Sequence, residues 1–84
     1  MDDLARDPRQ IGNAIRRARK KNKWSQSVLA KKAALRQETI SLIETGSAST
    51  RIETLLAVLA ALDLEFQIAP RSKGSDEDIK RLFS

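Results

Sequence analysis

The side chains best suited to hydrogen-bonding chemistry gather in one short stretch, RQETISLIE, at residues 36–44. Plotted as a helix at about 100° per residue, the stretch turns Ile40 and Ile43 to one face. A mixed set shares the opposite face: Gln37, Glu38, Ser41 and Leu42. An amide or a guanidinium offers paired hydrogen-bonding atoms in a fixed geometry. The stretch is therefore either an ordinary solvated helix or a surface that recognises a partner.

Catalytic and metal-binding chemistry is poorly provided for in this sequence. The chain has no histidine and no cysteine, which removes the commonest general base and metal ligand and every thiolate. The acidic run Asp76, Glu77 and Asp78 has no second carboxylate cluster to complete a metal site, so we expect it to be a solvated run. We therefore expect no enzymatic activity, no metal and no cofactor.

The composition also bears on location. A chain without cysteine suits a reducing cytoplasm. No apolar run approaches the roughly 20 residues that span a bilayer, and no signal-peptide h-region opens the chain. We expect a cytoplasmic protein without a membrane partner, associated with the nucleoid if its partner is DNA.

The charge distribution points to a polyanionic partner. The net charge is +5, and the charges are unevenly spread. Between Pro8 and Gln37 there is no acidic residue, whereas ten residues are basic: Arg9, Arg16, Arg17, Arg19, Lys20, Lys21, Lys23, Lys31, Lys32 and Arg36. A field of one sign is typical of nucleic-acid-binding proteins. The alternative is a solvated basic helix.

The first helix is predicted over residues 8–21. Asp7 is a good N-cap, Pro8 suits the first helical position, and Gln10 stands at capping-box spacing. An apolar stripe with helical spacing follows: Ile11, Ala14, Ile15 and Ala18.

Two shorter helices come next. Ser25 caps a helix of about nine residues that ends near Ala33, and Trp24 can pack on Leu29 as a hydrophobic staple. Such a short helix depends on tertiary packing. After a turn, the third helix is predicted over residues 36–45, with Gly46 as its C-terminal stop.

The fourth helix carries the strongest apolar stripe. Thr50 and Glu53 have capping-box spacing, and the helix is predicted to end near Asp63. The stripe consists of five residues at helical spacing: Ile52, Leu55, Leu56, Leu59 and Leu62. We expect this stripe to form the centre of the core.

The segment LEFQIAP predicts a β-strand, because Leu64, Phe66 and Ile68 alternate with less apolar residues until Pro70. A strand needs a hydrogen-bonded neighbour, and no other segment reads as one. The same strand of a second copy is the expected partner, in an antiparallel ribbon of a homodimer. The alternative is an extended segment lying on its own helices. The expected division is a disordered N-terminus (1–6), a DNA-binding domain (7–63), a dimerisation strand (64–70) and a flexible tail (71–84).

Two short helices joined by a three-residue turn form a helix-turn-helix. The run WSQSVLAKKAALRQETISLIETG resembles that of the XRE family of lambdoid-repressor-like DNA-binding domains. More closely, DPRQIGNAIRRARK, WSQSVLAKK, RQETIS and LDLEFQI resemble the HipB-type antitoxins of HipA-type kinase toxins. The resemblance covers roughly residues 7–69. It implies an all-α domain of four to five helices, completed by the C-terminal strand of the dimer.

The resemblance also implies roles for individual side chains. In this family the third helix lies in the major groove, with its N-terminal residues at the base edges. Gln37 can then read adenine, and Arg36 can read guanine. The full set of expected base contacts is Arg36, Gln37, Glu38, Ser41 and Ser27. The expected phosphate contacts are Ser25, Gln26, Thr45, Ser47 and Ser49.

Three tempting residues are expected to be structural. Arg19 and Glu44 stand at the edges of their apolar stripes and resemble a partly buried ion pair of the lambdoid repressors. Trp24 is expected to be a staple rather than a stacking platform for a base. The family usually has a glycine where this chain has Ala34, because a left-handed residue is wanted there; with alanine, the turn is expected to be either strained or built differently.

The expected protein is a homodimeric repressor of a palindromic operator. By resemblance, it is a HipB-like antitoxin that represses its own operon and binds a HipA-type Ser/Thr kinase toxin. One alternative is a stand-alone XRE regulator with no toxin partner. Another is a protein-interaction module that has lost DNA binding, which Glu38 and Ala34 favour.

Overall fold

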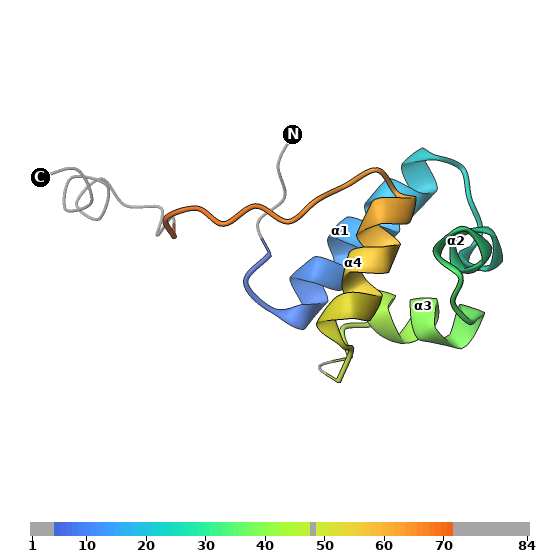
Figure 1. Cartoon of the computed structure of the whole chain (residues 1–84), viewed down its shortest axis with the longest axis horizontal. Coiled ribbons are helices and arrows are strands. Elements are labelled where there is room, and N and C mark those ends of the chain that lie inside the picture. Colours follow the sequence, from blue (N-terminus) through green and yellow to red (C-terminus); the bar gives the residue numbers. More distant parts are fainter. Residues whose placement is uncertain (1–4, 48, 72–84) are drawn as a thin grey trace, which may run out of the picture.

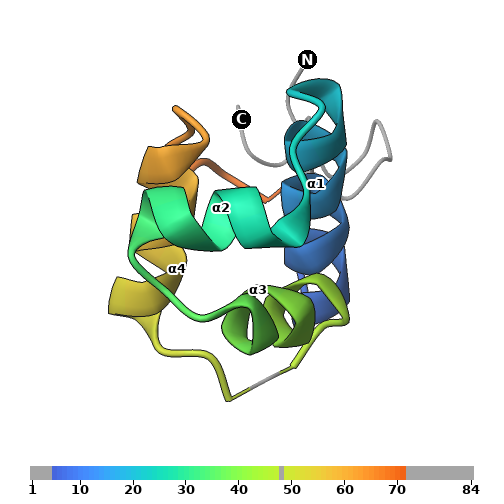
Figure 2. The ribbon, with the colours of Figure 1, turned by 90° about the vertical axis from the view of Figure 1, so that its right-hand side faces the viewer.

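The fold, from a computed structural model that describes residues 5–47 and 49–71, is built of four helices (Figure 1). They are α1 (Pro8–Lys21), α2 (Gln26–Ala33), α3 (Gln37–Glu44) and α4 (Ile52–Ala61). Figure 2 shows α1 and α4 on either side, with α2 crossing in front of them and α3 beneath α2. The all-helical prediction is confirmed with four helices, the lower of the two numbers expected.

Local capping explains where α1 and α2 begin. The Asp7 carboxylate accepts a hydrogen bond from the Gln10 backbone N–H at 2.8 Å. The Gln10 amide in turn accepts from the Arg6 backbone N–H at 2.6 Å, one residue before the cap. In α2, the Ser25 hydroxyl accepts from the Val28 backbone N–H at 3.1 Å. Both caps satisfy backbone donors that the first helical turn leaves without partners.

The predicted capping box of α4 is wrong. The N-cap is Arg51, and its side chain makes no capping hydrogen bond. The Thr50 hydroxyl instead donates to the Ser47 carbonyl at 3.4 Å. Thr50 therefore closes the loop between α3 and α4, and α4 begins one residue later than the capping box implied.

The core joins all four helices. Its buried apolar residues are Ile15, Leu29, Ala30, Ile40, Ile43, Val58, Leu59 and Leu62. The predicted α4 stripe is only partly correct, because Ile52 is 73% exposed and Leu56 is 47% exposed. The helix is rotated so that Val58 faces inward, which leaves the row through Ile52 and Leu56 at the edge of the stripe. This edge is an apolar surface on the described chain.

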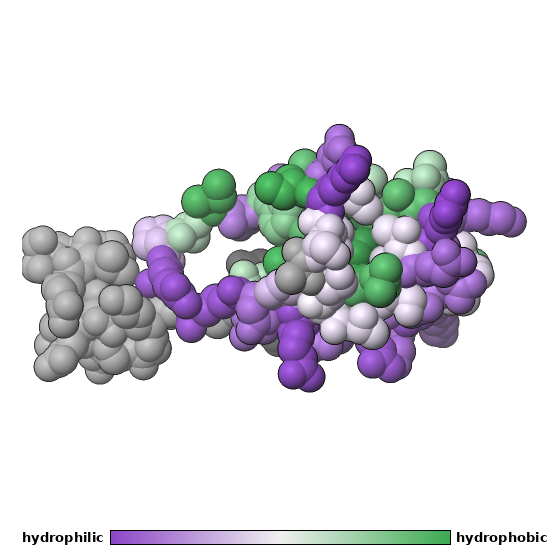
Figure 3. Space-filling model, turned by 90° about the horizontal axis from the view of Figure 1, so that it is seen from below, coloured by the Kyte–Doolittle hydropathy of each residue, from purple (hydrophilic) through white to green (hydrophobic). Residues whose placement is uncertain are grey.

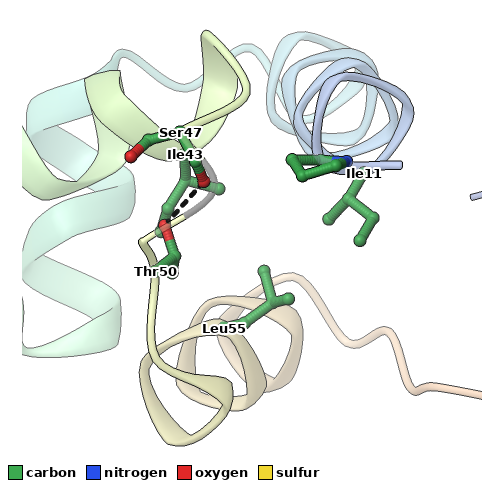
Figure 4. Close-up of a pocket in the computed structure, with 6 residues that line it drawn as sticks. Ile11, Ile43, Ser47, Thr50 and Leu55 are labelled. Carbon is green, nitrogen blue, oxygen red and sulfur yellow. Dashed lines mark hydrogen bonds between the residues drawn. The ribbon is translucent and has the colours of Figure 1, made fainter. Parts of the chain in front are cut away.

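A small hollow opens between α1, α4 and the loop that follows α3 (Figure 4). Its volume is about 90 Å³. Most of its lining is apolar, and it consists of Pro8, Ile11, Ile43, Ser47, Thr50 and Leu55. The Thr50–Ser47 hydrogen bond lies at its wall.

Gly12 lets α1 approach the C-terminal end of α3. A Cβ atom at Gly12 would lie 2.3 Å from the Ile43 carbonyl oxygen and 2.9 Å from that of Glu44. Both obstacles are backbone atoms, so neither can rotate away. The glycine therefore fixes how closely the first helix packs on the third.

We expect Gly12→Ala to lower the free energy of unfolding by about 1–2 kcal/mol. Overpacking costs about 1–3 kcal/mol, and the better helix propensity of alanine returns up to about 1 kcal/mol. Chemical denaturation followed by circular dichroism would measure the change. Asn13→Ala, at the neighbouring exposed position, is the control; it gains helix propensity without overpacking and should leave the midpoint unchanged or slightly raised. A Gly12→Ala variant as stable as the parent would contradict the close packing.

The turn between α2 and α3 contains a left-handed residue, as the resemblance implied. Ala34 has φ 57° and ψ 42°, and its neighbour Leu35 donates a backbone hydrogen bond to the Ala30 carbonyl at 2.8 Å. This bond closes the C-terminus of α2 in the manner of a Schellman motif. An L-residue with a Cβ is strained in this conformation by about 1–2 kcal/mol.

Ala34→Gly is expected to stabilise the protein by about 0.5–1 kcal/mol. Relief of the left-handed strain exceeds the extra conformational entropy that glycine brings to the unfolded chain. A thermal melt should show a higher midpoint than that of the parent. Ala60→Gly, at an exposed position inside α4, should shift the midpoint downward by a similar amount. A lower midpoint for Ala34→Gly would contradict the strain at this turn.

Residues 64–71 are extended but form no strand in the part of the chain that the structure describes. The segment leaves the C-terminus of α4 and runs away from the helices (Figure 1). Leu64, Phe66 and Ile68 are all exposed. The side chain of Ile68 makes almost no contact with the rest of the chain, because its relative solvent exposure is 101%. The alternative of a segment packed on its own helices therefore does not hold for Ile68. The predicted tail from Ser72 onward and the acidic run at 76–78 lie outside the described residues, as does most of the predicted disordered N-terminus.

Candidate nucleic-acid interface

The unit formed by α2, the turn and α3 presents the predicted reading residues on one side of the molecule. Ile40 and Ile43 hold α3 to the core. Gln37 and Glu38 are exposed on its outer side, and Ser41 is half-buried at the edge. The first turn of α3 therefore points its polar side chains away from the body.

A hydrogen bond brings together two residues that sequence reasoning had assigned separately to base contacts. The Ser27 hydroxyl, in the first turn of α2, donates to Gln37 Oε1 at 3.0 Å. The oxygen keeps a second lone pair, and the amide NH₂ keeps both donors. The Gln37 side chain is thus oriented by α2 while its donor and acceptor stay available to a ligand.

Arg36 and Glu38 flank this pair. Arg36 is the N-cap of α3, yet its side chain makes no capping hydrogen bond and extends from the exposed end of the helix. Glu38 lies in the first turn, where a negative charge is favourable beside the positive end of the helix dipole. Glu38 therefore has a local stabilising role at an N-terminus that has no side-chain cap.

The predicted phosphate contacts fall into two groups. Ser25 and Gln26 lie at the N-terminus of α2, where the Ser25 hydroxyl accepts from Val28 and keeps its own proton to donate. Thr45 lies at the end of α3 and donates its hydroxyl proton to the Leu42 carbonyl at 3.0 Å. Ser47 and Ser49, in the following loop, share a hydrogen bond of 3.1 Å. The Thr45 hydroxyl is therefore not a free donor, whereas that of Ser25 is.

Arg19 and Glu44 form a buried, bidentate ion pair between α1 and α3. Arg19 Nε lies 2.6 Å from Glu44 Oε2, and Arg19 Nη2 lies 3.0 Å from Glu44 Oε1. Both residues are only 8% exposed. The hydrogen bond to Glu44 raises the pKa of the Arg19 guanidinium above its usual value. The guanidinium also donates to the Trp24 carbonyl at 2.8 Å, so it holds the α1–α2 connection as well.

Gln26 connects this ion pair to the surface. Its amide Nε2 donates to Glu44 Oε1 at 3.3 Å. Gln26 is half-buried at the first position of α2, so its second amide proton can still reach outward. The Gln26–Glu44 hydrogen bond could not be predicted from local sequence, because it joins residues 18 positions apart in the chain.

Comparison with known proteins places this arrangement in a family. The model of the HTH_3 family, described as helix-turn-helix, matches residues 15–68. The chain belongs to this helix-turn-helix family. The match contains the whole of α2, the turn, α3 and α4, which are the elements that carry the site.

Two curated relatives of this helix-turn-helix protein are informative. Antitoxin HipB of Escherichia coli (strain K12) is 34% identical over 74 residues, which cover 88% of this chain and 84% of the relative. An uncharacterised HTH-type transcriptional regulator of Sinorhizobium fredii, y4dL, is 37% identical over 68 residues. That match covers 81% of this chain but only 35% of the regulator.

Solved structures agree with the sequence relatives. A HipB–O4 20mer complex contains a chain that superposes with a TM-score of 0.78 at 32% identity. A HipA–HipB–O2–O3 complex contains one with a TM-score of 0.77, also at 32% identity. Each match covers 84% of this chain and all of the other. The helix-turn-helix protein therefore shares both its fold and its sequence pattern with the HipB structures.

Trp24 lies at the junction between α1 and α2 of the helix-turn-helix protein. It is half-buried and packs against the core cluster. Its ring also lies 4.8 Å beneath the Lys32 ammonium, a cation–π distance. The indole is thus engaged on its inner side by the core and on its face by a lysine.

The basic residues of the helix-turn-helix protein remain at its surface, apart from Arg19. Hydrophilic side chains project around the edge of the side that carries α3 and the following loop (Figure 3). Arg9 was counted among the basic residues but given no role by sequence reasoning. The structure packs its stem on Gly46, where a Cβ would lie 2.7 Å from Arg9 Cγ. The first turn of α1 therefore places Arg9, an exposed basic residue, beside the loop after α3.

Two further features are absent from the residues that the structure describes, 5–47 and 49–71. None of their helices has the length and apolarity needed to cross a membrane. Their acidic side chains form no group of three or more that could hold a metal ion, and the chain has no histidine or cysteine.

Proposed function

We propose that this protein is a sequence-specific DNA-binding repressor of the HipB type, acting as a homodimer. The observation that carries the proposal is the outward first turn of α3, where Gln37 is oriented by Ser27 and Arg36 is unengaged. The fold supports it, because one similar chain comes from a HipB–O4 20mer complex. The surface charge supports it as well, since nine of the ten basic residues between Pro8 and Gln37 are exposed.

Base reading falls to the N-terminal half of α3. With α3 in the major groove, the Gln37 amide pairs with the N6 and N7 edge of adenine, and Arg36 pairs with guanine O6 and N7. Ser27 acts both through Gln37 and as a direct contact. Ser41 offers a hydroxyl beside them, and Glu38 accepts from cytosine N4.

Phosphate contacts hold the helix in register but carry no base information. The free Ser25 proton and the outward Gln26 amide proton meet the backbone on one side of α3, where the N-terminus of α2 adds its positive dipole end. Ser47 and Ser49 meet it on the other side, and Thr45 can contribute only by exchanging its hydrogen bond to the Leu42 carbonyl for one to a phosphate oxygen. Arg9, beside the same loop, adds a charge there.

A gel shift on DNA from upstream of its own gene tests the DNA-binding half. We expect a discrete complex that survives competitor DNA, and an affinity that falls steeply as salt concentration rises. Binding to an inverted repeat should exceed binding to a scrambled repeat of the same composition. Equal binding to the inverted and the scrambled repeat would contradict the proposal that the protein is a sequence-specific repressor.

Dimerisation is proposed to use the extended segment after α4. Leu64, Phe66 and Ile68 are exposed in the single chain, and the α4 edge through Ile52 and Leu56 is exposed too. Pairing the segment with its copy in a second chain gives the backbone its ladder partners and covers apolar side chains. A two-fold dimer matches a palindromic operator, because each recognition helix then meets one half-site.

Deleting residues 64–68 is expected to produce a helical monomer with much weaker operator binding. Each half-site contact alone lacks the gain that a linked second contact provides, typically 10²- to 10⁴-fold. Sedimentation equilibrium would measure the mass, and circular dichroism would show that the helices persist. Replacing Glu65 and Gln67 by alanine keeps the apolar residues and should keep the dimer. A truncated protein that sediments as a dimer would contradict this role.

The antitoxin part of the proposal is that the protein represses its own operon and neutralises a HipA-type Ser/Thr kinase. It is supported by the HipB relatives and by the similar chain in a HipA–HipB–O2–O3 complex. A pull-down with the tagged protein should recover a kinase encoded beside it, and co-expression should relieve the toxicity of that kinase. Recovery of no kinase, with no kinase gene adjacent, would reject this part.

A stand-alone regulator is the second candidate, and one relative favours it. The Sinorhizobium fredii protein is named as a transcriptional regulator rather than as an antitoxin. In that case the gel shift succeeds and the pull-down fails. The two experiments together therefore separate the two candidates.

A further inference from the structure

Leu42 is a large apolar residue on the outer side of α3. It is 57% exposed, while its neighbours on the inner side, Ile40 and Ile43, are almost completely buried. Its position in the helix is about 140° around from Gln37 and one turn after Glu38. Leu42 therefore shares the outward surface of the reading helix but stands apart from the Ser27–Gln37 pair.

The backbone around Leu42 is firmly held. Its carbonyl oxygen accepts two hydrogen bonds, from the Ser47 backbone N–H at 2.9 Å and from the Thr45 hydroxyl at 3.0 Å. These bonds close the C-terminal turn of α3, where helix ends otherwise fray. The side chain is thus presented from a fixed point, as a specificity contact requires.

The Ser27–Gln37 bond divides the outer surface into two parts. The hydrogen bond to Ser27 holds the Gln37 side chain near α2. Glu38 and Leu42 therefore occupy the middle of the exposed side of α3. In the major groove, the only apolar group that a base edge displays is the C5-methyl of thymine. An exposed leucine in the middle of a groove-facing helix therefore has one natural counterpart.

We propose that Leu42 is a specificity-determining residue that packs against a thymine C5-methyl group in each half-site. The inference rests on the proposed DNA binding and adds an apolar contact to its polar readers. It predicts that the preferred site carries a thymine at a position served by neither Gln37 nor Arg36. The contact removes both the leucine side chain and the methyl group from water.

Substitution of thymine by deoxyuridine tests the contact, because it removes only the methyl group. The preferred site is first selected from random DNA, and each thymine is then replaced in turn. For the parent protein, we expect one position per half-site at which deoxyuridine weakens binding about fourfold, the effect of losing one buried methyl-sized group. Leu42→Ala should bind thymine DNA about as weakly as the parent binds DNA that carries deoxyuridine at this position in both half-sites, and it should no longer distinguish thymine from deoxyuridine there.

Leu42→Met is the matched control. It keeps an apolar side chain on the same backbone and should keep most of the sensitivity to deoxyuridine. Circular dichroism should show all three proteins equally folded, since position 42 is outside the core.

The outcomes separate the inference from the function on which it rests. Sequence-specific binding with no thymine sensitive to deoxyuridine overturns the role of Leu42 and leaves the repressor proposal standing. An equal deoxyuridine effect in the parent and in Leu42→Ala does the same, because another residue then makes the contact. Failure to select any preferred site overturns both.

Discussion

Glu44→Ala is expected to lower the free energy of unfolding by about 3–5 kcal/mol. Removing the carboxylate leaves the Arg19 guanidinium buried without its counter-charge, and removal of one member of a buried ion pair typically costs this much. The Gln26 amide loses an acceptor at the same time. The whole stability of a domain of this size is of order 5–15 kcal/mol, so the variant is expected to be partly unfolded at 37 °C.

Thermal and denaturant unfolding followed by circular dichroism would measure this effect. Each kcal/mol shifts the Tm of a domain this small by about 4–8 °C, so a fall of more than about 12 °C is expected. The control is the double variant Arg19→Met, Glu44→Leu, which replaces both charges with apolar groups of similar size. Such replacements are often neutral, so the double variant should be more stable than Glu44→Ala. A loss below about 1 kcal/mol for Glu44→Ala would show that the pair is not essential.

The direction of the Arg19 pKa shift limits where this pair responds to pH. In the folded state, the hydrogen bond to Glu44 raises the pKa of the guanidinium above its usual value. A group with a raised folded-state pKa contributes stability that is complete below its unfolded pKa and is lost as pH rises through the folded value. Arg19 therefore contributes constant stability throughout the physiological range, and its contribution declines only in strong alkali.

Gln37→Ala is expected to have the largest effect on sequence discrimination. A bidentate contact between an amide and adenine is worth about 1–3 kcal/mol, which corresponds to a loss of about 5- to 150-fold for each half-site of the preferred site. The variant should also accept other bases at the position that Gln37 reads. Ser27→Ala should produce a smaller change in the same direction, because it releases the Gln37 side chain without removing it.

Quantitative gel shifts on the preferred site and its single-base variants would test this. The affinity for unrelated DNA should be unchanged, because non-specific binding depends on the phosphates. Asn13→Ala removes an exposed amide from α1 and should alter neither affinity nor preference. If Gln37→Ala keeps the parent's preference at every position, Gln37 is not a reader.

Features that depend on neighbouring residues were predictable from the sequence. The bounds of α1 follow from Asp7, Pro8 and the apolar stripe, and they agree with the structure. Ser25 caps α2 as expected. In both cases the decisive hydrogen bond joins residues three positions apart, so local sequence contains all the information needed.

Features that depend on tertiary or intermolecular neighbours were not predictable in the same way. Periodicity located the α4 stripe but could not tell which edge stays outside, so Ile52 and Leu56 were wrongly placed in the core. Thr50 has capping-box spacing with Glu53, yet the Ser47 carbonyl competes for its hydroxyl. The strand predicted at 64–70 is not formed in the single chain that the structure describes, where its backbone has no ladder partner; a second copy as the partner remains a proposal.

In the candidate site, too, some features could be predicted from local sequence and others depend on tertiary packing. The outward position of Gln37 and Glu38 follows from the spacing of Ile40 and Ile43. The Ser27–Gln37 and Gln26–Glu44 bonds join helices across 10 and 18 residues, and only the packed fold reveals them. The resemblance to lambdoid repressors was needed to expect the Arg19–Glu44 pair, since like spacing occurs on many helices.

Glu44 belongs to α3, binds Arg19 of α1 and accepts from Gln26 of α2, so one carboxylate is shared by three helices. If the protein is the repressor proposed above, a genetic selection for loss of repression is therefore expected to recover substitutions here as readily as at Gln37. The two classes will look alike in a reporter strain, although one lacks a reader and the other lacks a folded domain. Growth at reduced temperature separates them, because repression should return for scaffold variants and stay absent for reader variants.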